Sequence, residues 1–429
     1  MTLPGATAPG EEALRAEVRA WVEANWDPDL TVRGWWARLA DSGWAYPTWP
    51  VGSFGRGLDQ EAAAVVADEL ARAGVLGPPH NQAQTMGAPV LLDFGTPEQR
   101  ERWLRRLATG EEAWCQFFSE PGAGSDLASV QTRAERDGDE WVVNGQKVWT
   151  GGAQYSDRGI LVARTDPDKP KHRGLSFFVI DVDQPGIEIR PLRQMNHAAH
   201  FNEVFFTDAR VPDANLVGGL DNGWAVAMAT LAYERSAYAA GAVRLRTVTP
   251  GRKAGFLDLT VRDALARLDE LDEHALEPFP LGDTAAMVAL AREHGRDRDP
   301  VIRQRIAELH AIAETARLTA LRARANARAG RAPGPESSLG YLLGVTIARR
   351  TRDLALEIVG AGGMLEGRDA PRDGAVAQMA LSAQVHGIQG GTEQIQRTIL
   401  GERVLGLPKE PVVDRDVPFR LLKVGTQRG

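Results

Sequence analysis

A glycine-rich segment with hydroxyl groups at both ends is the first part of the sequence whose residue types could bind a ligand. Residues 116–126 read Gln-Phe-Phe-Ser-Glu-Pro-Gly-Ala-Gly-Ser-Asp. Glycine lets backbone N–H groups approach an anion or a flat ring closely, and Ser119 and Ser125 add directional donors. On local chemistry alone, the segment is either a ligand-binding loop or an ordinary turn.

Two further segments join small residues to an aromatic or polar side chain. Residues 144–150 read Asn-Gly-Gln-Lys-Val-Trp-Thr, and the Asn-Gly pair between two apolar triplets predicts a hairpin turn. The indole of Trp149 suits either a planar cofactor or the core. Near the C-terminus, Gly390 and Gly391 permit close backbone approach, and Thr392 can cap the helix that follows. The N-terminus of that helix suits an anion, although a simple loop-to-helix junction has the same pattern.

The elements that must position these segments are segregated along the chain. Alanine-rich runs at 61–73 and 98–108 predict helices before residue 110, and helical spacing returns after Gly223. It continues to about Leu405, where Gly406 and Pro408 provide a stop. Between the two helical regions, short apolar or alternating runs predict strands at 141–143, 147–149, 160–163, 175–180, 187–189 and 203–206.

This order predicts an α+β fold with four parts. They are a helical bundle at residues 1–111, a β barrel or sandwich at 112–222, a second helical bundle at 223–408 and a tail at 409–429. A Rossmann-type nicotinamide site is disfavoured because strands and helices do not alternate. The Gly-Ala-Gly-Gly run at 360–363 also has no strand before it, so it is a weak dinucleotide signal.

Composition narrows the class of protein further. The chain has 429 residues, 43% of them hydrophobic, which is ordinary for a globular protein large enough to bury a cofactor. A net charge of -7 supplies no basic field for nucleic acid. The single cysteine, Cys115, excludes an internal disulfide and a thiolate metal site. No apolar run approaches the length of a membrane span, so we expect a cytoplasmic protein with no membrane or nucleic-acid partner and no metal.

At this spacing, the first two segments resemble the acyl-CoA dehydrogenase family. The middle domain of that family carries a T/S-E-P-x-A-G-S-D loop followed by N-G-x-K-x-W. The resemblance extends to Phe201-Asn202-Glu203-Val204-Phe205-Phe206 with Val211-Pro212, and to residues 391–397, and so spans most of the chain. It implies the acyl-CoA dehydrogenase fold, FAD as cofactor and an acyl thioester as substrate, in fatty-acid or steroid side-chain degradation.

The resemblance also implies roles for individual residues. Phe118, Ser119 and Trp149 would line the flavin, Thr392 and Gln394 would meet it from the C-terminal domain, and Ser125 would face the acyl-CoA and the cofactor. The full cofactor set comprises Gln116, Phe118, Ser119, Trp149, Gly151, Arg292, Glu357, Gly360, Ala361, Thr392 and Gln394. The substrate set comprises Ser125, Tyr233, Arg235 and Gly391.

The base that removes the α-proton needs a carboxylate, and many family members place it immediately before Gly-Thr in the C-terminal loop. Gly390 occupies that position here. Relatives that resemble isovaleryl- and long-chain acyl-CoA dehydrogenases use a Glu on an earlier helix, and Glu234-Arg235 matches that alternative. Its neighbours on the helix face are Thr230, Leu231, Ala237 and Tyr238, which are largely apolar.

Desolvation on an apolar face makes a carboxylate a stronger proton acceptor, as a general base requires. The alternative reading of Glu234 is a structural ion pair with an Arg of another helix. Because Gly390 supplies no carboxylate, the reading of Glu234 as the catalytic base is favoured over the ion pair. The family resemblance implies that the backbone N–H of Gly390 and a flavin ribityl hydroxyl polarise the thioester carbonyl, an arrangement of the oxyanion-hole type.

The sequence departs from the family pattern at three places. Gly151 stands where the family commonly has a hydroxyl residue that donates to flavin N5, so here a backbone N–H would be the donor. The R-x-x-F-G element that reaches the FAD of a neighbouring subunit is not recognisable at 292–296, which leaves Arg292 as its candidate. Residues 246–290 form an insertion in which 261–275 could be an added helix. We therefore expect either a homodimer or homotetramer, or a hetero-oligomer with a related subunit.

Several functional alternatives fit the same sequence. A dehydrogenase would pass electrons to an electron-transfer flavoprotein, whereas an acyl-CoA oxidase would pass them to O2. A non-catalytic partner subunit of a heteromeric enzyme would complete another chain's flavin site. A flavin monooxygenase has no need of Glu234 on an apolar face. The shape of the acyl group, and the choice between coenzyme A and an acyl carrier protein, stay open.

Overall fold

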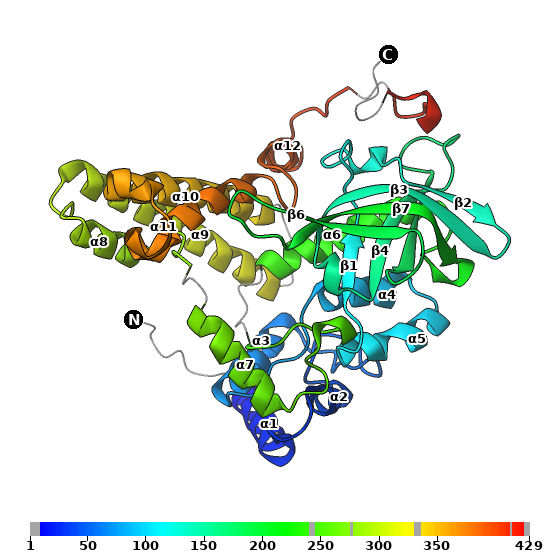
Figure 1. Ribbon diagram of the computed structural model, residues 1–429, viewed down its shortest axis with the longest axis horizontal. Coiled ribbons are helices and arrows are strands. Elements are labelled where there is room, and N and C mark those ends of the chain that lie inside the picture. The colour runs from blue at the N-terminus through cyan, green and yellow to red at the C-terminus, as the bar shows by residue number, and fades with distance from the viewer. Residues whose placement is uncertain (1–8, 240–244, 275–277, 330–335, 412–413, 424–429) are drawn as a thin grey trace. The chain divides into compact units, whose positions relative to one another are not determined.

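The computed structural model describes residues 9–239, 245–274, 278–329, 336–411 and 414–423 (Figure 1). Their contacts divide the chain into two compact units. Unit 1 comprises Met1–Leu192, Ala199–Glu273 and Val413–Gly429, and unit 2 comprises Arg193–Ala198 and His274–Val412. Each unit is described below by itself.

The N-terminal part of unit 1 is helical, as predicted. Its helices are α1 (Pro9–Asn25), α2 (Val32–Asp41), α3 (Gln60–Arg72), a π-helical turn η1 (Ala83–Gly87), α4 (Ala88–Phe94) and α5 (Pro97–Ala108). The start of α5 is fixed by a capping box, in which Thr96 and Gln99 each bond the other's backbone N–H. Asp59 caps α3 in the same region. The helices predicted at 61–73 and 98–108 are confirmed.

The middle of unit 1 is one eight-stranded sheet. Seven strands follow the order β6-β7-β3-β2-β4-β5-β8, and β1 pairs in parallel with β4. The strands are β1 (Trp114–Phe117), β2 (Arg133–Asp137), β3 (Glu140–Gly151), β4 (Arg158–Arg164), β5 (Leu175–Asp181), β6 (Ile187–Leu192), β7 (Phe201–Pro212) and β8 (Leu216–Val217). All the predicted strand segments fall within this sheet.

The predicted hairpin turn at Asn144-Gly145 is wrong. Both segments that flank it belong to the continuous strand β3, and the register with β7 shifts between Val143 and Gly145. Gly145 has φ +155°, and a Cβ there would lie 2.7 Å from the Cα of Thr132. The glycine therefore serves a bulge and a close backbone contact, while the turn is at Gly138, between β2 and β3.

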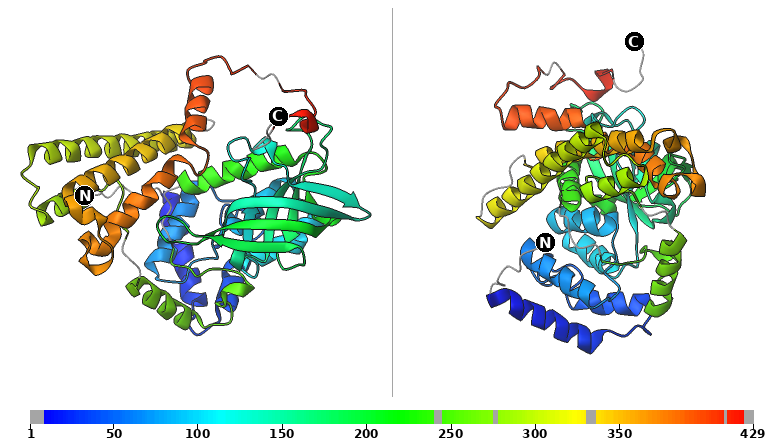
Figure 2. Two further views of the ribbon diagram at one scale, coloured as in Figure 1. Left: turned by 45° about the horizontal axis from the view of Figure 1, so that its top comes forward. Right: turned by 90° about the vertical axis from the view of Figure 1, so that its left-hand side faces the viewer.

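The central strands are buried on both faces. Ile160 and Val162 of β4 belong to a core shared with α4, α5 and α6, whereas Leu161 and Ala163 belong to a core shared with β3 and β7. Helix α6 (Gly223–Ala239) packs against β4 and β5 (Figure 2). A Cβ at Gly223 would lie 2.5 Å from the backbone of Ser176, so glycine is needed where α6 meets β5.

The first part of the inserted segment, residues 246–273, folds against the N-terminal helices of unit 1, whereas residues 274–290 belong to unit 2. Val248, Leu257 and Val261 are buried in one core with residues of α1, α2 and α3. The predicted helix at 261–275 is present as α7 (Val261–His274), although residue 275 lies outside the described part of the chain. Backbone bonds from Val32 to Leu259 and from Gly77 to Arg246 fix the segment further.

Unit 2 is helical and has its own core. Its helices are α8 (Thr284–Glu293), α9 (Pro300–Arg328), α10 (Glu336–Val359), α11 (Ala375–Ser382) and α12 (Glu393–Arg403). Met287, Leu290, Ile302 and Leu354 are among the residues buried between them. The Gly360–Met364 segment is a 3-10 turn that ends α10.

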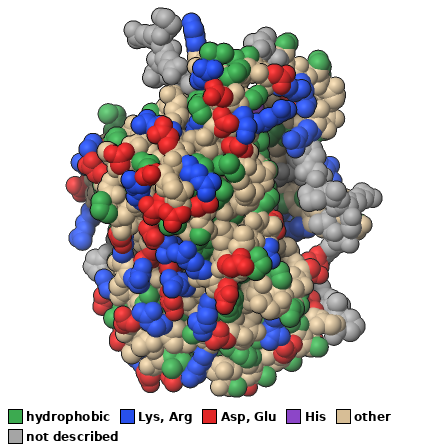
Figure 3. All heavy atoms as spheres, turned by 90° about the vertical axis from the view of Figure 1, so that its right-hand side faces the viewer, with side chains coloured by type: hydrophobic (Ala, Val, Ile, Leu, Met, Phe, Trp, Pro, Cys, Tyr) green, Lys and Arg blue, Asp and Glu red, His purple; other side chains and the backbone are tan. Residues whose placement is uncertain are grey.

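The surface of the described residues is mixed in charge. On the face that Figure 3 shows, basic and acidic side chains are interspersed. Exposed ion pairs such as Arg210–Asp137 and Arg136–Asp213 are typical of the sheet. Among the described helices, none has the length and apolar character that crossing a bilayer requires.

Candidate functional site

The glycine-rich loop, residues 119–126, is tied to β3 by a buried ion pair. Lys147 is fully buried, and its Nζ donates to the Glu120 carboxylate and to the Phe118 carbonyl, both at 2.9 Å. The carboxylate also accepts from the backbone N–H groups of Gln131 and Thr132, at 2.7 and 2.9 Å. Separating the two partners would leave a buried charge unpaired, which is costly. The pair therefore fixes the position of the loop relative to β3.

Both members of this pair are shifted from their ordinary pKa values. Burial alone would raise the pKa of Glu120, but the Lys147 ammonium and the hydrogen bonds that the carboxylate accepts lower it overall. Burial lowers the pKa of Lys147, against the opposing effect of Glu120. Because its pKa lies below the ordinary value of 4.5, the Glu120 carboxyl is ionised at neutral pH.

Beyond the ion pair, β3 presents Trp149 to the outside. The indole is 61% exposed, and the residue has φ +63°, an uncommon conformation for a bulky side chain. The register of β3 with β7 shifts between Lys147 and Thr150, and the Trp149 ring meets Phe201 edge-on at 6.1 Å. An exposed aromatic ring on a strained backbone is typical of a ligand site.

The rest of the loop is open while its ends are fixed. Phe118 is buried, and the Ser119 carbonyl accepts from the N–H of Val148, which places Ser119 beside β3. Gly124 and Ser125 are exposed, and no atom lies within 4 Å of the position of a Cβ on Gly124. The sequence-predicted residues Phe118, Ser119 and Trp149 are thus brought together, with Ser125 further along the same loop.

Gly151, at the end of β3, pairs with Phe201 of β7. A Cβ on Gly151 would lie 3.3 Å from Nε2 of Gln82. The hydroxyl side chain that is common at this position in the family would therefore require Gln82 to move.

Glu234 lies on α6, partly buried, in the same unit. Its Oε2 is 3.4 Å from Nε2 of Gln116 on β1, at the long end of the hydrogen-bond range. Thr230, one turn earlier, is fully buried, and Leu231 packs on the core. The side chains of Arg235, Ala237 and Tyr238 lie outside the described part of the chain, so the predicted apolar face is seen only on its N-terminal side.

Tyr233, the neighbour of Glu234, points toward α4. Its hydroxyl donates a short hydrogen bond to Asp93. Burial, then the Asp93 carboxylate, raises the pKa of Tyr233 to about 12. The tyrosine is therefore a neutral hydrogen-bond donor one residue from Glu234.

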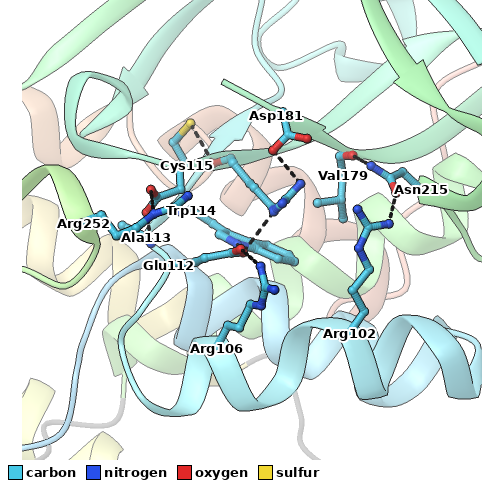
Figure 4. Close-up of polar contacts among 12 residues, drawn as sticks. Arg102, Arg106, Glu112, Ala113, Trp114, Cys115, Val179, Asp181, Asn215 and Arg252 are labelled. Atoms are coloured by element: carbon cyan, nitrogen blue, oxygen red, sulfur yellow. Dashed lines mark hydrogen bonds and ion pairs between the residues drawn. The ribbon is translucent and has the colours of Figure 1, made fainter. Parts of the chain in front are cut away.

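The strand that carries Gln116 is anchored by a second buried network. The Glu112 carboxylate accepts from Arg106, Trp114 and Arg158, at 2.9, 3.1 and 3.0 Å (Figure 4). Arg158 also pairs with Asp181 at 2.6 Å. Burial would raise the pKa of Glu112, but Arg158 and the hydrogen bonds lower it. The network joins α5 to β1, β4 and β5.

In unit 2, the segment 390–394 starts helix α12. The Thr392 side chain accepts from the N–H of Ile395, which confirms the predicted cap. Gly390 and Gly391 have φ +70° and +92°. The buried Gln396 side chain reaches back to the Gly390 carbonyl at 3.4 Å and accepts from Ser338 at 2.8 Å. Gln394 is exposed on the first turn of α12.

The remaining predicted cofactor residues also lie in unit 2. Arg292 is exposed near the end of α8, and Gly360 and Ala361 are exposed where α10 ends. Glu357 forms an ion pair with Arg305 of α9. Among the described residues, no cluster of metal ligands is found.

Comparison with known proteins identifies the class of protein. Family models match the acyl-CoA dehydrogenase N-terminal domain at residues 8–111, the middle domain at 115–209 and the C-terminal domain at 281–405. The chain belongs to the acyl-CoA dehydrogenase family, and it is an oxidoreductase that dehydrogenates acyl-CoA. Members of this family typically depend on FAD.

Two of the similar proteins come from Mycobacterium tuberculosis. Acyl-CoA dehydrogenase IpdE1 of Mycobacterium tuberculosis is 36% identical, over 93% of this chain and 98% of its own length. A structure named Tcur3481-Tcur3483 steroid ACAD has a TM-score of 0.68 and 27% identity, over 94% of this chain and 99% of that one. The ChsE4-ChsE5 complex of Mycobacterium tuberculosis has a TM-score of 0.65 and 27% identity, over 95% and 100%.

The residues present fit the flavin that the family implies. Trp149 offers an exposed ring, the loop offers open space at Gly124, and the buried hydroxyl oxygen of Thr150 has no hydrogen-bond partner within the described part of the chain. The sequence did not reveal the contact between Gln116 and Glu234, because the two residues are 118 positions apart. Only the fold brings them together, because α6 packs on β4 and β5, and β1 pairs with β4.

Proposed function

We propose that this chain catalyses FAD-dependent α,β-dehydrogenation of an acyl-CoA thioester to the trans-2-enoyl-CoA, with Glu234 as the base. The observation that supports this most is the position of Glu234. The carboxylate is partly buried on α6, and the Gln116 amide lies 3.4 Å from it, on the strand that leads into the glycine-rich loop. At the position where many relatives carry the base, Gly390 has no side chain.

In this proposal the residues of the chain divide the work. Glu234 removes the proton beside the thioester carbonyl, and Gln116 holds the carboxylate in one rotamer. The backbone N–H of Gly390 stabilises the negative charge that develops on the carbonyl oxygen. Phe118, Ser119 and Trp149 hold the flavin ring, with Gln116, Gly151, Arg292, Glu357, Gly360, Ala361, Thr392 and Gln394 as the other cofactor candidates. FAD, when bound, accepts the β-hydrogen as a hydride.

Substitution Glu234→Gln tests the base. Because the amide cannot accept the proton, we expect kcat to fall by about 10²- to 10⁴-fold with FAD content unchanged. The measurement is anaerobic bleaching of the flavin absorbance by an acyl-CoA. Turnover close to that of the unmodified chain, with FAD bound, would refute the assignment.

Glu203→Gln is the matched control. Glu203 is also a partly buried carboxylate that accepts from a glutamine, Gln146, at 3.1 Å, but it lies on β7. We expect its rate to stay within about twofold, since exchanging the carboxylate for an amide there removes no proton acceptor from the reaction. An equal loss in both variants would point to a general effect on folding.

We propose a bulky, ring-containing acyl group as the substrate class. The support is that one similar structure is named a steroid ACAD. A bleaching screen across short, branched, long and polycyclic acyl-CoA thioesters tests this, and preference for a straight chain would contradict it. Electron transfer to an electron-transfer flavoprotein rather than to O2 is part of the same proposal, and a stoichiometric peroxide yield in air would overturn it.

We further propose that the active assembly contains a related second subunit. Two of the similar structures are named as pairs of different chains. The sequence at 292–296 lacks the Arg-x-x-Phe-Gly element by which relatives reach a neighbour's FAD. Size-exclusion mass and FAD content, with and without a co-expressed related chain, test the idea. A homo-oligomer with full FAD occupancy would contradict it.

A further inference from the structure

The last described residues, 414–423, form a strap on unit 1. They lie on the loop between β4 and β5, and Pro418 forms an antiparallel bridge with Pro170 of that loop. The N–H of Phe419 donates to the Lys169 carbonyl at 2.9 Å, and the N–H of Arg420 donates to the Pro167 carbonyl at 3.0 Å. A short 3-10 turn, Phe419–Leu421, follows (Figure 1). Backbone pairing thus fixes the register of the strap.

Phe419 is the residue by which the strap is anchored. Its side chain is only 8% exposed, and its ring centroid lies 3.7 Å from the guanidinium carbon of Arg164. Arg164 is 3% exposed, and burial lowers its pKa to about 10. A buried cation against an aromatic face is stabilised by the ring and is shielded by it from water. The ring therefore holds the guanidinium in position.

Arg164 in turn holds the chain that leaves the glycine-rich loop. Its Nη2 donates to the carbonyls of Ala128 and Val130, at 2.6 and 3.3 Å, and its Nη1 donates to the Lys171 carbonyl at 2.6 Å. One guanidinium thus joins three segments: residues 128–130, the β4–β5 loop and the strap.

A second link runs through charges. Lys171 Nζ lies 3.1 Å from Asp126, the last residue of the glycine-rich loop, and 3.5 Å from Asp414 of the strap. Asp126 also accepts from the Ser129 hydroxyl at 2.5 Å. Both links end within five residues of Ser125, the loop residue that we assign to the acyl-CoA.

We infer that Phe419 is a positioning residue for acyl-CoA binding, acting through Arg164 on the glycine-rich loop. The inference rests on the proposed function for the identity of the ligand. The loop is exposed between Gly124 and Asp126, so its conformation depends on the anchors at its two ends. Glu120 and Lys147 anchor the end of the loop nearer Phe118 and Ser119, and Arg164 with Phe419 anchors the end nearer Ser125, the residue assigned to the acyl-CoA. Loss of the second anchor weakens substrate binding and leaves the flavin side intact.

Substitution Phe419→Ala tests this directly. We expect KM for the acyl-CoA to rise about tenfold, the size of one lost cation–π contact, with kcat within about twofold and FAD content unchanged. Phe419→Tyr keeps the ring and is expected to restore KM. Leu421→Ala is the matched control in the same strap, because that side chain is 65% exposed, and its KM should equal that of the unmodified chain.

A measurement without substrate separates this inference from the proposed function. The N–H groups of Ser129 and Val130 bond to the carbonyls of Asp126 and Leu127, at 2.9 and 3.2 Å. Their hydrogen exchange should accelerate about tenfold in Phe419→Ala and not in Leu421→Ala. Unchanged exchange, or a lower melting temperature with KM unchanged, would overturn the inference. Faster exchange in a chain that oxidises no acyl-CoA would overturn the proposed function alone.

Discussion

Trp149 combines two features that stability alone does not favour. Its side chain is 61% exposed, and its backbone is in the left-handed region at φ +63°. A non-glycine residue in that region costs about 1 kcal/mol or more, so it persists only where its surroundings enforce it. Here Lys147 is locked by Glu120 on one side, and Thr150 is paired with Asn202 on the other. The proposed function gives this strain a role, because there a flavin ring binds against the indole.

Trp149→Gly should therefore separate stability from cofactor binding. Glycine relieves the left-handed strain, so the apo protein should gain about 1 kcal/mol in free energy of unfolding while FAD affinity falls. Unfolding in urea and the flavin absorbance after gel filtration measure the two effects. Trp149→Phe is the control, since it keeps both a ring and the strain and should show no gain. A destabilised glycine variant would show that the indole is structural.

At single residues, the sequence predicted the contacts of the glycine-rich loop better than the surroundings of Glu234. Phe118, Ser119 and Trp149 lie together because they belong to two short motifs, residues 116–126 and 144–150. The ion pair between Glu120 and Lys147 joins these motifs. The contact of Glu234 with Gln116, by contrast, is set by how α6 packs on the sheet that contains β1, and no local pattern contains that information. Whether Glu234 and Gly390 act as proposed stays a prediction.

Elements with a clear period or cap were predicted well. Helices α3 and α5 have Asp59 and Thr96 as caps and an apolar stripe, and β4 and β5 are continuous apolar runs because both faces are buried. Strands β1, β2 and β8 were not predicted. Strand β2 is mostly exposed and charged, and β8 has only two residues, so neither has a pattern to detect.

The two glycines of the β2–β3 region should respond differently to substitution. Gly145→Ala places a Cβ 2.4 Å from Thr132 Oγ1 and 2.7 Å from its Cα, against backbone that cannot move aside. We expect a loss of about 3 kcal/mol or more in the free energy of unfolding.

Gly138→Ala is the control for this comparison. That position has φ +66° and nothing within 4 Å, so only the conformational cost of about 1 kcal/mol applies. Urea unfolding followed by tryptophan fluorescence measures both variants. Equal losses would indicate that Gly145 is needed only for its backbone conformation and not for the close contact.

At the scale of the whole molecule, tryptophan fluorescence reports on unit 1 alone. All eleven tryptophans lie between Trp21 and Trp224, within that unit. Unit 1 also contains the two buried carboxylates whose pKa values are lowered, Glu112 and Glu120. Tryptophan fluorescence therefore follows the unfolding of the part of the chain that these carboxylates stabilise.

Acid should destabilise unit 1. A carboxyl whose folded-state pKa is lowered stabilises the fold above its ordinary value of 4.5, and this stabilisation is lost as pH falls toward the folded-state value. We expect the contribution of these two carboxylates to the free energy of unfolding to be constant from pH 7 to about 5 and to decline below 4.5. Glu112→Gln should be less stable by about 3 kcal/mol at pH 7 and should decline less steeply. A parallel decline would contradict the role of Glu112.

The buried cysteine has a practical consequence for measuring how the strap, residues 414–423, docks on unit 1. Cys115 on β1 is fully buried, and burial raises the pKa of its thiol to about 12, so at neutral pH it offers a labelling reagent neither access nor thiolate. A cysteine introduced at the exposed position of Leu421 would be the sole reactive thiol of the chain. A fluorophore or spin label placed there would report on docking of the strap in the otherwise unmodified enzyme, free of background.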